Sequence, residues 1–229
     1  MVRLRPQVII FDVDGVLVDA RGSYHRTIVQ TVRHFTGRRV RLAEIHRWKS
    51  RPGYNDDWKL TTDWIRTLGR KVSYSEVKQQ FEQFYWGSNS DGNVTLERWL
   101  APRAWLRRWS QRAELAVFTG RTRRETQRTL EAFRVEPYFR RIVTTSEVAR
   151  PKPDPEGLLR ILDGREPDIA MYLGDNIDDA LAAQGAGIPF VGVLPRNSYA
   201  RKYRAAGLRR LGASTIIGSV LELEKVWQA

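Results

Sequence analysis

Two aspartates separated by one residue follow a short apolar run near the start of the chain. The run is Val8–Phe11, and the aspartates are Asp12 and Asp14. If the run is a β-strand, side chains two positions apart face the same way, so both carboxylates point to one spot. In an open α/β sheet, ligands bind at the edge formed by the carboxyl ends of the strands. The spacing therefore predicts a site with carboxylate chemistry where the first strand ends.

A second acidic cluster occupies a corresponding position much later in the chain. The stretch YLGDNIDD, Tyr172–Asp179, leaves an apolar run and enters a helical pattern. If the two strands are neighbours, four or five carboxylates share one pocket, and their mutual repulsion favours a bound cation. Oxygen ligands without a nearby His or Cys are typical of Mg²⁺, so the sequence predicts a magnesium site.

Two further segments could bind an anion at the same edge. Another apolar run ends in Thr119 and Gly120, where a hydroxyl and backbone N–H groups could hold phosphate oxygens. Lys152 lies between prolines that stiffen its loop, and a fixed ammonium group suits a phosphate or a carboxylate. Arg121, the next residue after Gly120, could contact the substrate or be a solvated residue at the start of a helix.

These residues require strands and helices that alternate along the chain. Apolar runs of strand length are Val8–Phe11, Leu115–Phe118, Ile169–Leu173, Phe190–Val193 and, more weakly, Ile142–Thr144. Helical patterns between them are Thr122–Phe133, Pro155–Leu162 with Asp154 as its cap, and Ile177–Ala186. The alternation predicts an α/β fold with a doubly wound parallel (Rossmann-like) sheet core.

One long segment interrupts this alternation. Between about residues 22 and 98 no strand is evident, and the amphipathic patterns Tyr24–Phe35, Asp56–Leu68 and Ser75–Trp86 indicate helices. We therefore predict a discontinuous α/β core made of residues 1–21 and 99–229, with an inserted α-helical domain over residues 22–98.

The four motifs occur in a fixed order, each at or just after a strand. They are DVDGV, the strand that ends in Thr119, the lysine of KPDP, and GDNIDD. In this combination the chain resembles the haloacid dehalogenase-like (HAD) hydrolase superfamily. Its insert resembles the helical C1-type cap of the subfamily I phosphatases. The resemblance implies a Mg²⁺-dependent phosphomonoester hydrolase that acts through an aspartyl-phosphate intermediate.

The resemblance also implies a role for each motif residue. Asp12 would attack phosphorus, and Asp14 would act first as an acid and then as a base. The residues implied to bind the phosphoryl group are Thr119, Gly120 and Lys152. The implied metal ligands are Asp12, Asp14 through its carbonyl, Asp175 and, through a water, Asp179. Asp178 is interpreted as a residue of the helix start, with a metal role as the alternative.

A polar and aromatic loop of the insert, residues 48–58, is the candidate for substrate selection. Lys49, Arg51 or Asn55 could touch the leaving group. The alternative is that Asp56 caps the next helix and Trp58 packs within the insert. The layout of the insert and the stretch GDNIDDALAAQGAGIPFVGVLP also resemble a phosphatase branch associated with histidine biosynthesis, which makes histidinol phosphate a conceivable substrate.

Composition limits the other classes of function. The 229 residues include no cysteine, which excludes thiol catalysis and Cys-ligated zinc. The formal net charge is +13, but the basic residues are spread without long blocks, so we favour a solvated surface over nucleic-acid binding. No apolar stretch approaches the roughly 18 residues of a membrane span, and the start does not read as a signal peptide. We expect a cytoplasmic monomer or homodimer that acts on a small phosphorylated metabolite.

Two alternative functions stay open at this point. A phosphomutase uses the same pair of aspartates but must exclude water from its intermediate. A basic protein that binds nucleic acid or processes its ends could also use this fold, although the complete set of motif residues argues against lost catalysis.

Overall fold

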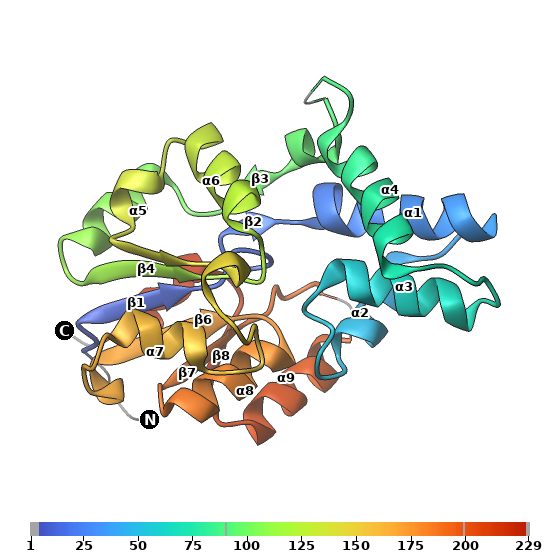
Figure 1. Ribbon diagram of the computed structural model, residues 1–229. Helices are drawn as coiled ribbons and strands as arrows, with labels where there is room; N and C mark the ends of the chain where they lie inside the picture. The colour runs from blue at the N-terminus through green and yellow to red at the C-terminus, as the bar shows by residue number, and fades with distance from the viewer. Residues whose placement is uncertain (1–4, 90, 199, 228–229) are drawn as a thin grey trace. The chain divides into compact units, whose positions relative to one another are not determined.

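The computed structural model describes residues 5–89, 91–198 and 200–227, and the chain divides into two compact units (Figure 1). The α/β unit comprises Met1–Val18 and Trp99–Ala229, and the helical unit comprises Asp19–Arg98. The chain passes between them at β2 (Val18–Asp19) and β3 (Arg98–Trp99), which pair as a two-stranded sheet. The first boundary between the units follows residue 18, whereas the sequence analysis placed it after residue 21. The second boundary follows residue 98, as the sequence analysis placed it.

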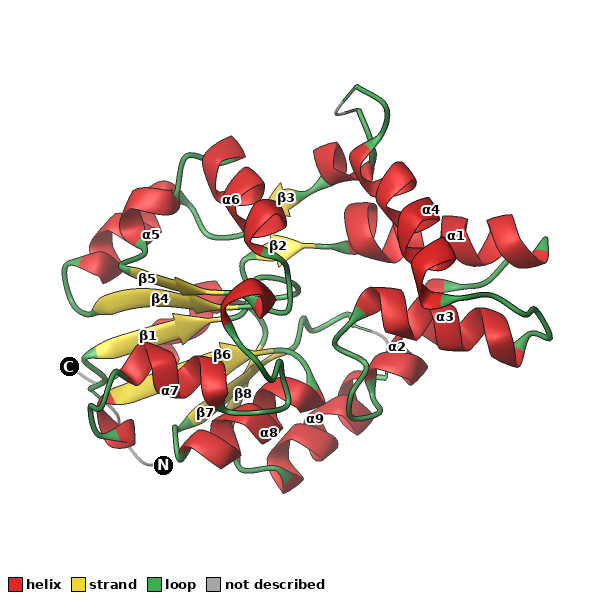
Figure 2. Cartoon of the chain, viewed as in Figure 1, coloured by secondary structure: helices red, strands yellow, loops and turns green. Residues whose placement is uncertain are grey.

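A six-stranded parallel sheet forms the centre of the α/β unit (Figure 2). Its strands are β1 (Val8–Phe11), β4 (Glu114–Phe118), β5 (Arg141–Val143), β6 (Ala170–Gly174), β7 (Phe190–Val193) and β8 (Ala213–Ile217). They are arranged in the order β5-β4-β1-β6-β7-β8. All four residues of β1 are buried, as expected of a central strand covered on both faces. The predicted α/β fold with a doubly wound parallel sheet is confirmed.

Helices cover both faces of this sheet. They are α5 (Arg103–Ser110) and α6 (Arg123–Ala132) on one face, and α7 (Glu156–Leu162), α8 (Ile177–Ala186) and α9 (Arg201–Arg210) on the other. Ile9 and Phe11 belong to the core beneath α5 and α6, whereas Val8 and Ile10 belong to the core beneath the other three helices. Most strand side chains are therefore committed to packing, and the aspartates predicted at the site lie beyond the strand ends.

The sheet has one strand more than the sequence analysis predicted. The five predicted strands are present, and their ends differ by at most one residue from the observed ones. The additional strand, β8, has the sequence ASTII and lies at the edge of the sheet. This sequence has neither a continuous apolar run nor a regular alternation of polar and apolar residues. Its partly exposed side chains are tolerated because an edge strand has a neighbouring strand on one side only.

The predicted helices of the α/β unit correspond to α6, α7 and α8. Asp154 Oδ1 accepts a hydrogen bond from the Glu156 N–H at 2.9 Å, so its side chain supports the start of α7, although Pro155 occupies the N-cap position. Helices α5 and α9 were not predicted. The sequence of α9, RKYRAAGLRR, buries only Ala205 and Leu208, so its apolar face is too narrow to stand out.

The helical unit contains α1 (Arg26–Thr36), α2 (Leu42–Lys49), α3 (Asp57–Thr67) and α4 (Tyr74–Trp86). Its own core includes Ile28, Leu60 and Phe81, all fully buried. A capping box formed by Ser73 and Glu76 begins α4. Helix α2 was not predicted. Among the described residues of the whole chain, no helix combines the length and apolarity needed to cross a membrane.

Candidate active site

The sheet order brings the two predicted acidic segments together. Strand β1 pairs with β6 in parallel, with Phe11 opposite Leu173, and each strand is followed directly by an acidic segment. Carboxylate oxygens of Asp12, Asp175 and Asp179 all lie within 4.8 Å of one another. Residues far apart in sequence thus form one acidic cluster at the carboxyl edge of the sheet.

Lys152 is buried inside this cluster. Its ammonium group donates to Asp12 Oδ1 at 2.9 Å and to Asp179 Oδ1 at 2.7 Å, and the lysine side chain has no exposed surface. The rings of Phe118 and Tyr172 lie beneath the same nitrogen, at 4.7 and 5.3 Å from their centroids. Two carboxylates and two aromatic faces therefore hold one buried positive charge beside Asp12.

Asp179 is saturated with hydrogen bonds. Its Oδ1 accepts from Lys152 and from the Tyr172 hydroxyl, both at 2.7 Å. Its Oδ2 accepts from the backbone N–H groups of Asp175 at 3.1 Å and Asn176 at 3.0 Å, which closes the N-terminal capping box of α8. Because each oxygen already has two donors, the arrangement favours an indirect contribution to a metal site, through the orientation of Lys152 and of the Asp175 loop.

Burial and charge act in opposite directions on the two central groups. Burial raises the pKa of Asp12 to about 8; Lys152 opposes this rise, and the carboxylates of Asp179, Asp14 and Asp175 reinforce it. Burial lowers the pKa of Lys152, but the charges of Asp12 and Asp179 outweigh burial and raise that pKa above its usual value. Asp12 is therefore a carboxyl group that needs an additional positive charge to remain ionised at neutral pH.

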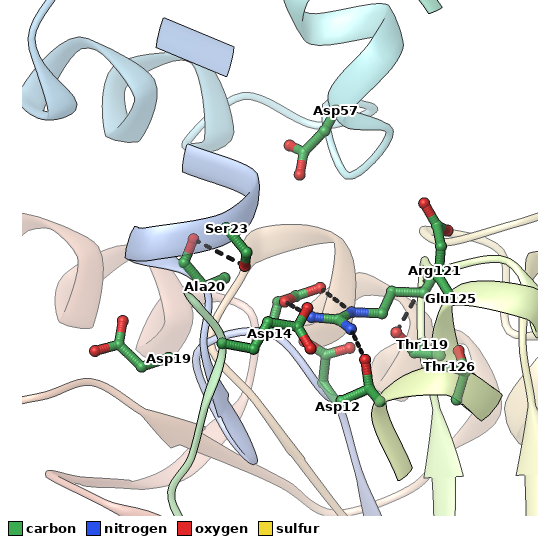
Figure 3. Close-up of polar contacts among 12 residues, drawn as sticks. Asp12, Asp14, Asp19, Ala20, Ser23, Asp57, Thr119, Arg121, Glu125 and Thr126 are labelled. Atoms are coloured by element: carbon green, nitrogen blue, oxygen red, sulfur yellow. Dashed lines mark hydrogen bonds and ion pairs between the residues drawn. The ribbon is translucent and has the colours of Figure 1, made fainter. Parts of the chain in front are cut away.

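Arg121 pairs with Asp14 through both carboxylate oxygens. Its Nε donates to Oδ2 at 3.0 Å and its Nη2 donates to Oδ1 at 2.7 Å, and Figure 3 shows the two side chains pointing at each other beside Asp12 and Thr119. A third bond joins Nη1 to Thr129 Oγ1 of α6 at 2.7 Å. The Arg121 side chain is almost wholly buried. Of the two alternatives for Arg121, the solvated residue at a helix start is wrong, because its guanidinium is buried against Asp14. Contact with a substrate stays a prediction.

Thr119 and Gly120, the residues predicted to bind phosphate, follow the end of β4. Thr119 is buried, and its backbone N–H bonds to the Val143 carbonyl of the neighbouring strand at 3.1 Å. Its hydroxyl oxygen accepts from the Arg121 N–H at 3.2 Å, across Gly120. Because the hydroxyl accepts this bond, its own proton can be donated to an oxygen of a bound anion.

Two glycines allow the acidic loops to approach this closely. A Cβ added to Gly15 would lie 2.6 Å from Asp175 Oδ2, and one added to Gly174 would lie 2.5 Å from the Cβ of Asp179. Gly15 also has a φ of +78°, which favours glycine. Both positions therefore require glycine to bring the carboxylates together.

The donor set of the cluster fits a hard divalent cation. The carboxylates are those of Asp12, Asp14, Asp175 and Asp179, and the paired cations are Lys152, Arg121 and Arg204. With all groups ionised, the negative charges exceed the positive ones by one. A dication would leave the site with a net positive charge, which favours the approach of a phosphate dianion.

Two of the three candidate residues of the helical unit have partners within that unit. Lys49 Nζ forms an ion pair with Asp57 at 2.8 Å, and the Arg51 guanidinium lies 4.9 Å from the centre of the Trp48 ring. Asn55 is half-buried in the loop between α2 and α3. A contact of these side chains with a substrate stays a prediction.

The alternative interpretation of this loop is confirmed. The Asp56 side chain accepts from the N–H groups of Trp58 at 2.8 Å and Lys59 at 3.0 Å, so it caps α3. The Trp58 ring packs edge-on against Phe81 in the core of the unit.

Two contributors to the site were not predicted. Tyr172 orients Asp179 through its hydroxyl, and Arg204 of α9 donates to Asp175 Oδ2 at 2.9 Å. A tyrosine within a buried strand needs a polar partner, which is a pattern that could have identified Tyr172. No comparable pattern distinguishes Arg204 from the other basic residues of α9.

Comparisons with known proteins agree with this geometry. The family model of haloacid dehalogenase-like hydrolases matches residues 9–193. An imidazoleglycerol-phosphate dehydratase of Phytophthora nicotianae is 33% identical over 95% of this chain, and the chain spans 52% of that relative. Phosphoglycolate phosphatase 1 of Pseudomonas aeruginosa is 24% identical over 80% of this chain and 67% of its own length.

The solved structures are similar in fold. A predicted phosphoglycolate phosphatase from Haemophilus somnus superimposes with a TM-score of 0.77 at 21% identity, covering 98% of this chain and 99% of its own. At this identity the similarity concerns the fold alone. With the family model matched across both motif-bearing halves of the sheet, the chain belongs to the haloacid dehalogenase-like hydrolase family.

Proposed function

We propose that this protein is a Mg²⁺-dependent phosphomonoester hydrolase that acts on small phosphorylated metabolites through an aspartyl-phosphate intermediate. The observation that carries the proposal is the buried contact of Lys152 with Asp12 at 2.9 Å, next to Asp175 at the carboxyl edge of the sheet. A carboxylate held between an ammonium group and a metal site can approach an anionic phosphate, which an isolated carboxylate cannot.

Hydrolysis would proceed in two displacements. The Asp12 carboxylate attacks phosphorus, the bond from phosphorus to the leaving oxygen breaks, and Asp14 donates a proton to that oxygen. A water molecule then attacks phosphorus while Asp14 takes its proton, and the bond to Asp12 breaks to release phosphate. Both oxygens of Asp14 accept a hydrogen bond from Arg121, which fixes the direction of the carboxylate for these proton transfers.

Seven residues have defined parts in the proposed metal and phosphate sites. The Asp12 carboxylate, the Asp14 backbone carbonyl and Asp175 would hold Mg²⁺, with Asp179 acting indirectly. Mg²⁺ would supply neutralisation of the charge between the nucleophile and the phosphate. The Thr119 hydroxyl, the Gly120 backbone and Lys152 would bind the phosphoryl oxygens.

The proposed substrate class rests on the proposed phosphatase activity and on the name of one relative. The relative that is 33% identical is named for a reaction of imidazoleglycerol phosphate. We therefore propose phosphate esters that carry an imidazole, histidinol phosphate among them, as the first substrates to test. Substrate selection would involve the helical unit, with Lys49, Arg51 and Asn55 as the candidate residues.

The proposal predicts that phosphate release depends on the metal. The purified protein should release phosphate from an aryl phosphate in millimolar Mg²⁺, and excess chelator should reduce the rate by at least about 10²-fold, because Asp12 loses the charge that keeps it ionised. Colorimetric detection of phosphate measures both rates, and restoring Mg²⁺ is the control. Full activity in excess chelator would contradict the metal assignment. A sugar phosphate that is isomerised without phosphate release would instead identify a phosphomutase.

The pKa of Asp12 predicts a pH-dependent affinity for Mg²⁺. In the metal-free protein this carboxyl group, with a pKa of about 8, is protonated at neutral pH, so binding must displace the proton. The dissociation constant should fall roughly 50-fold from pH 6 to pH 8 and only about twofold more at pH 9. Isothermal titration calorimetry at each pH measures it, and an affinity that does not change between pH 6 and 8 would show that Asp12 is not a ligand.

A further inference from the structure

An arginine from outside the four motifs holds the candidate metal ligand Asp175. Arg204 Nη2 donates to Asp175 Oδ2 at 2.9 Å and to the backbone carbonyl of the same residue at 3.0 Å. The carboxylate of Asp175 is one of the three whose oxygens lie within 4.8 Å of each other. A fixed positive charge is therefore bound to a carboxylate that the proposed function assigns to a dication.

The helix that carries Arg204 is firmly attached to the sheet. Ala205 and Leu208 are buried in the core beneath α9, and Arg201 Nε donates to the Leu194 carbonyl at 3.1 Å, just after β7. The Arg204 side chain itself is only 14% exposed. Its guanidinium cannot leave Asp175 without breaking two hydrogen bonds and entering a different packing arrangement.

Arg204 has two opposing effects on a metal at Asp175. It fixes the direction of the carboxylate, which favours binding, but an aspartate side chain has few torsions to order, so this gain is small. It also repels the metal, and the repulsion scales with the product of the charges, so a dication experiences it twice as strongly as a monovalent ion. Repulsion is therefore the larger effect at this short range.

We propose that Arg204 is a positioning residue that competes with Mg²⁺ for Asp175 and thereby lowers the affinity of the site for the metal. This inference rests on the proposed function, because it assumes that Asp175 is a metal ligand. It assigns to α9 the control of how much of the enzyme is loaded at a given Mg²⁺ concentration.

The experiment compares two glutamine variants on the same helix. Arg204→Gln and Arg209→Gln remove one positive charge each, but Arg209 is exposed on the surface of α9. Calorimetric titration of the full chain with Mg²⁺, at one pH and ionic strength, should give a dissociation constant about tenfold lower for Arg204→Gln. Arg209→Gln should stay within about twofold of the unmodified protein. If the glutamine variant does not fold, Arg204→Met keeps the packing of the aliphatic stem and replaces it.

The outcomes separate this inference from the proposed function. Equal affinities for the two variants, or weaker binding by Arg204→Gln, would overturn the competition and make Arg204 an organiser of the loop. Absence of saturable Mg²⁺ binding to the unmodified protein would overturn both the competition and the proposed metal site. Tighter binding confined to the Arg204 variants would support both.

Discussion

Replacing Asp12 by asparagine should abolish turnover and leave the fold intact. An amide cannot form the phosphorus–oxygen bond, so we expect phosphate release to fall by at least about 10³-fold. The expected cost in stability is small for a physical reason. In the metal-free protein burial raises the pKa of Asp12 to about 8, so the group is already neutral at pH 7. The asparagine oxygen can still accept the hydrogen bond from Lys152.

The matched control for this variant is Asp168→Asn. This variant makes the same chemical change at an exposed residue. Asp168 lies just before β6, at the amino end of the strand and away from the site. Both variants should unfold in chemical denaturant close to the midpoint of the unmodified chain, and only Asp12→Asn should be inactive. A near-normal rate for Asp12→Asn would remove Asp12 as the nucleophile.

Replacing Lys152 by methionine should destroy activity and also destabilise the protein. The ammonium group lies between Asp12 and Asp179 with no exposed surface, so its removal leaves the buried Asp179 carboxylate and the hydrogen-bonded oxygen of Asp12 without their shared partner. Breaking a buried ion pair from one side costs about 3–5 kcal/mol of the free energy of unfolding at neutral pH. Loss of the charge proposed to bind phosphate should lower turnover by at least about 10³-fold.

The destabilisation in Lys152→Met should depend on pH in a defined direction. Lys152 lowers the pKa of Asp12, so without it the pKa of this carboxyl in the folded state rises further above the unfolded value. A raised folded pKa adds stability at low pH, and that stability is lost as the pH rises through the folded pKa. In the unmodified protein this loss ends near the Asp12 pKa of about 8, whereas in the variant it continues up to the higher pKa. The difference in free energy of unfolding between the two proteins should therefore be constant up to about pH 7 and grow as the pH rises above about 8.

An exposed lysine provides the comparison for this measurement. Lys225 is paired with one carboxylate, Glu222, at 2.7 Å on the surface. Denaturant unfolding of Lys225→Met should give a free energy close to that of the unmodified protein, because exposed pairs contribute little. Similar stabilities and rates for Lys152→Met and Lys225→Met would contradict the role of the buried triad.

Much of the α/β unit was predictable because its elements are encoded locally. An apolar run such as Val8–Phe11 must be covered on both faces, and its length allows only a strand. The carboxyl ends of parallel strands share an edge, so Asp12 and Asp175 were expected to converge if their strands were neighbours. The structure meets that condition, because β1 pairs with β6. Strand β8 escaped prediction because an edge strand needs no continuous apolar run.

Some residues of the site could be located from the sequence around them, and others could not. The motif residues Asp12, Thr119, Lys152 and Asp175 each follow a strand or lie between prolines, so their position could be inferred from local pattern. Their catalytic roles stay predictions that the variants above test.

The sequence by itself determined five of the six strands of the main sheet and the helices α6, α7 and α8 between them, the acidic segments at two strand ends, and the family to which the chain belongs. Only the tertiary structure decided which charges are paired. Arg121 meets Asp14 across 107 positions in the chain, and Arg204 meets Asp175 from a helix that precedes the last strand. Such pairs depend on which strands are neighbours in the sheet and on how each helix docks, and neither is encoded in the residues that flank the arginines.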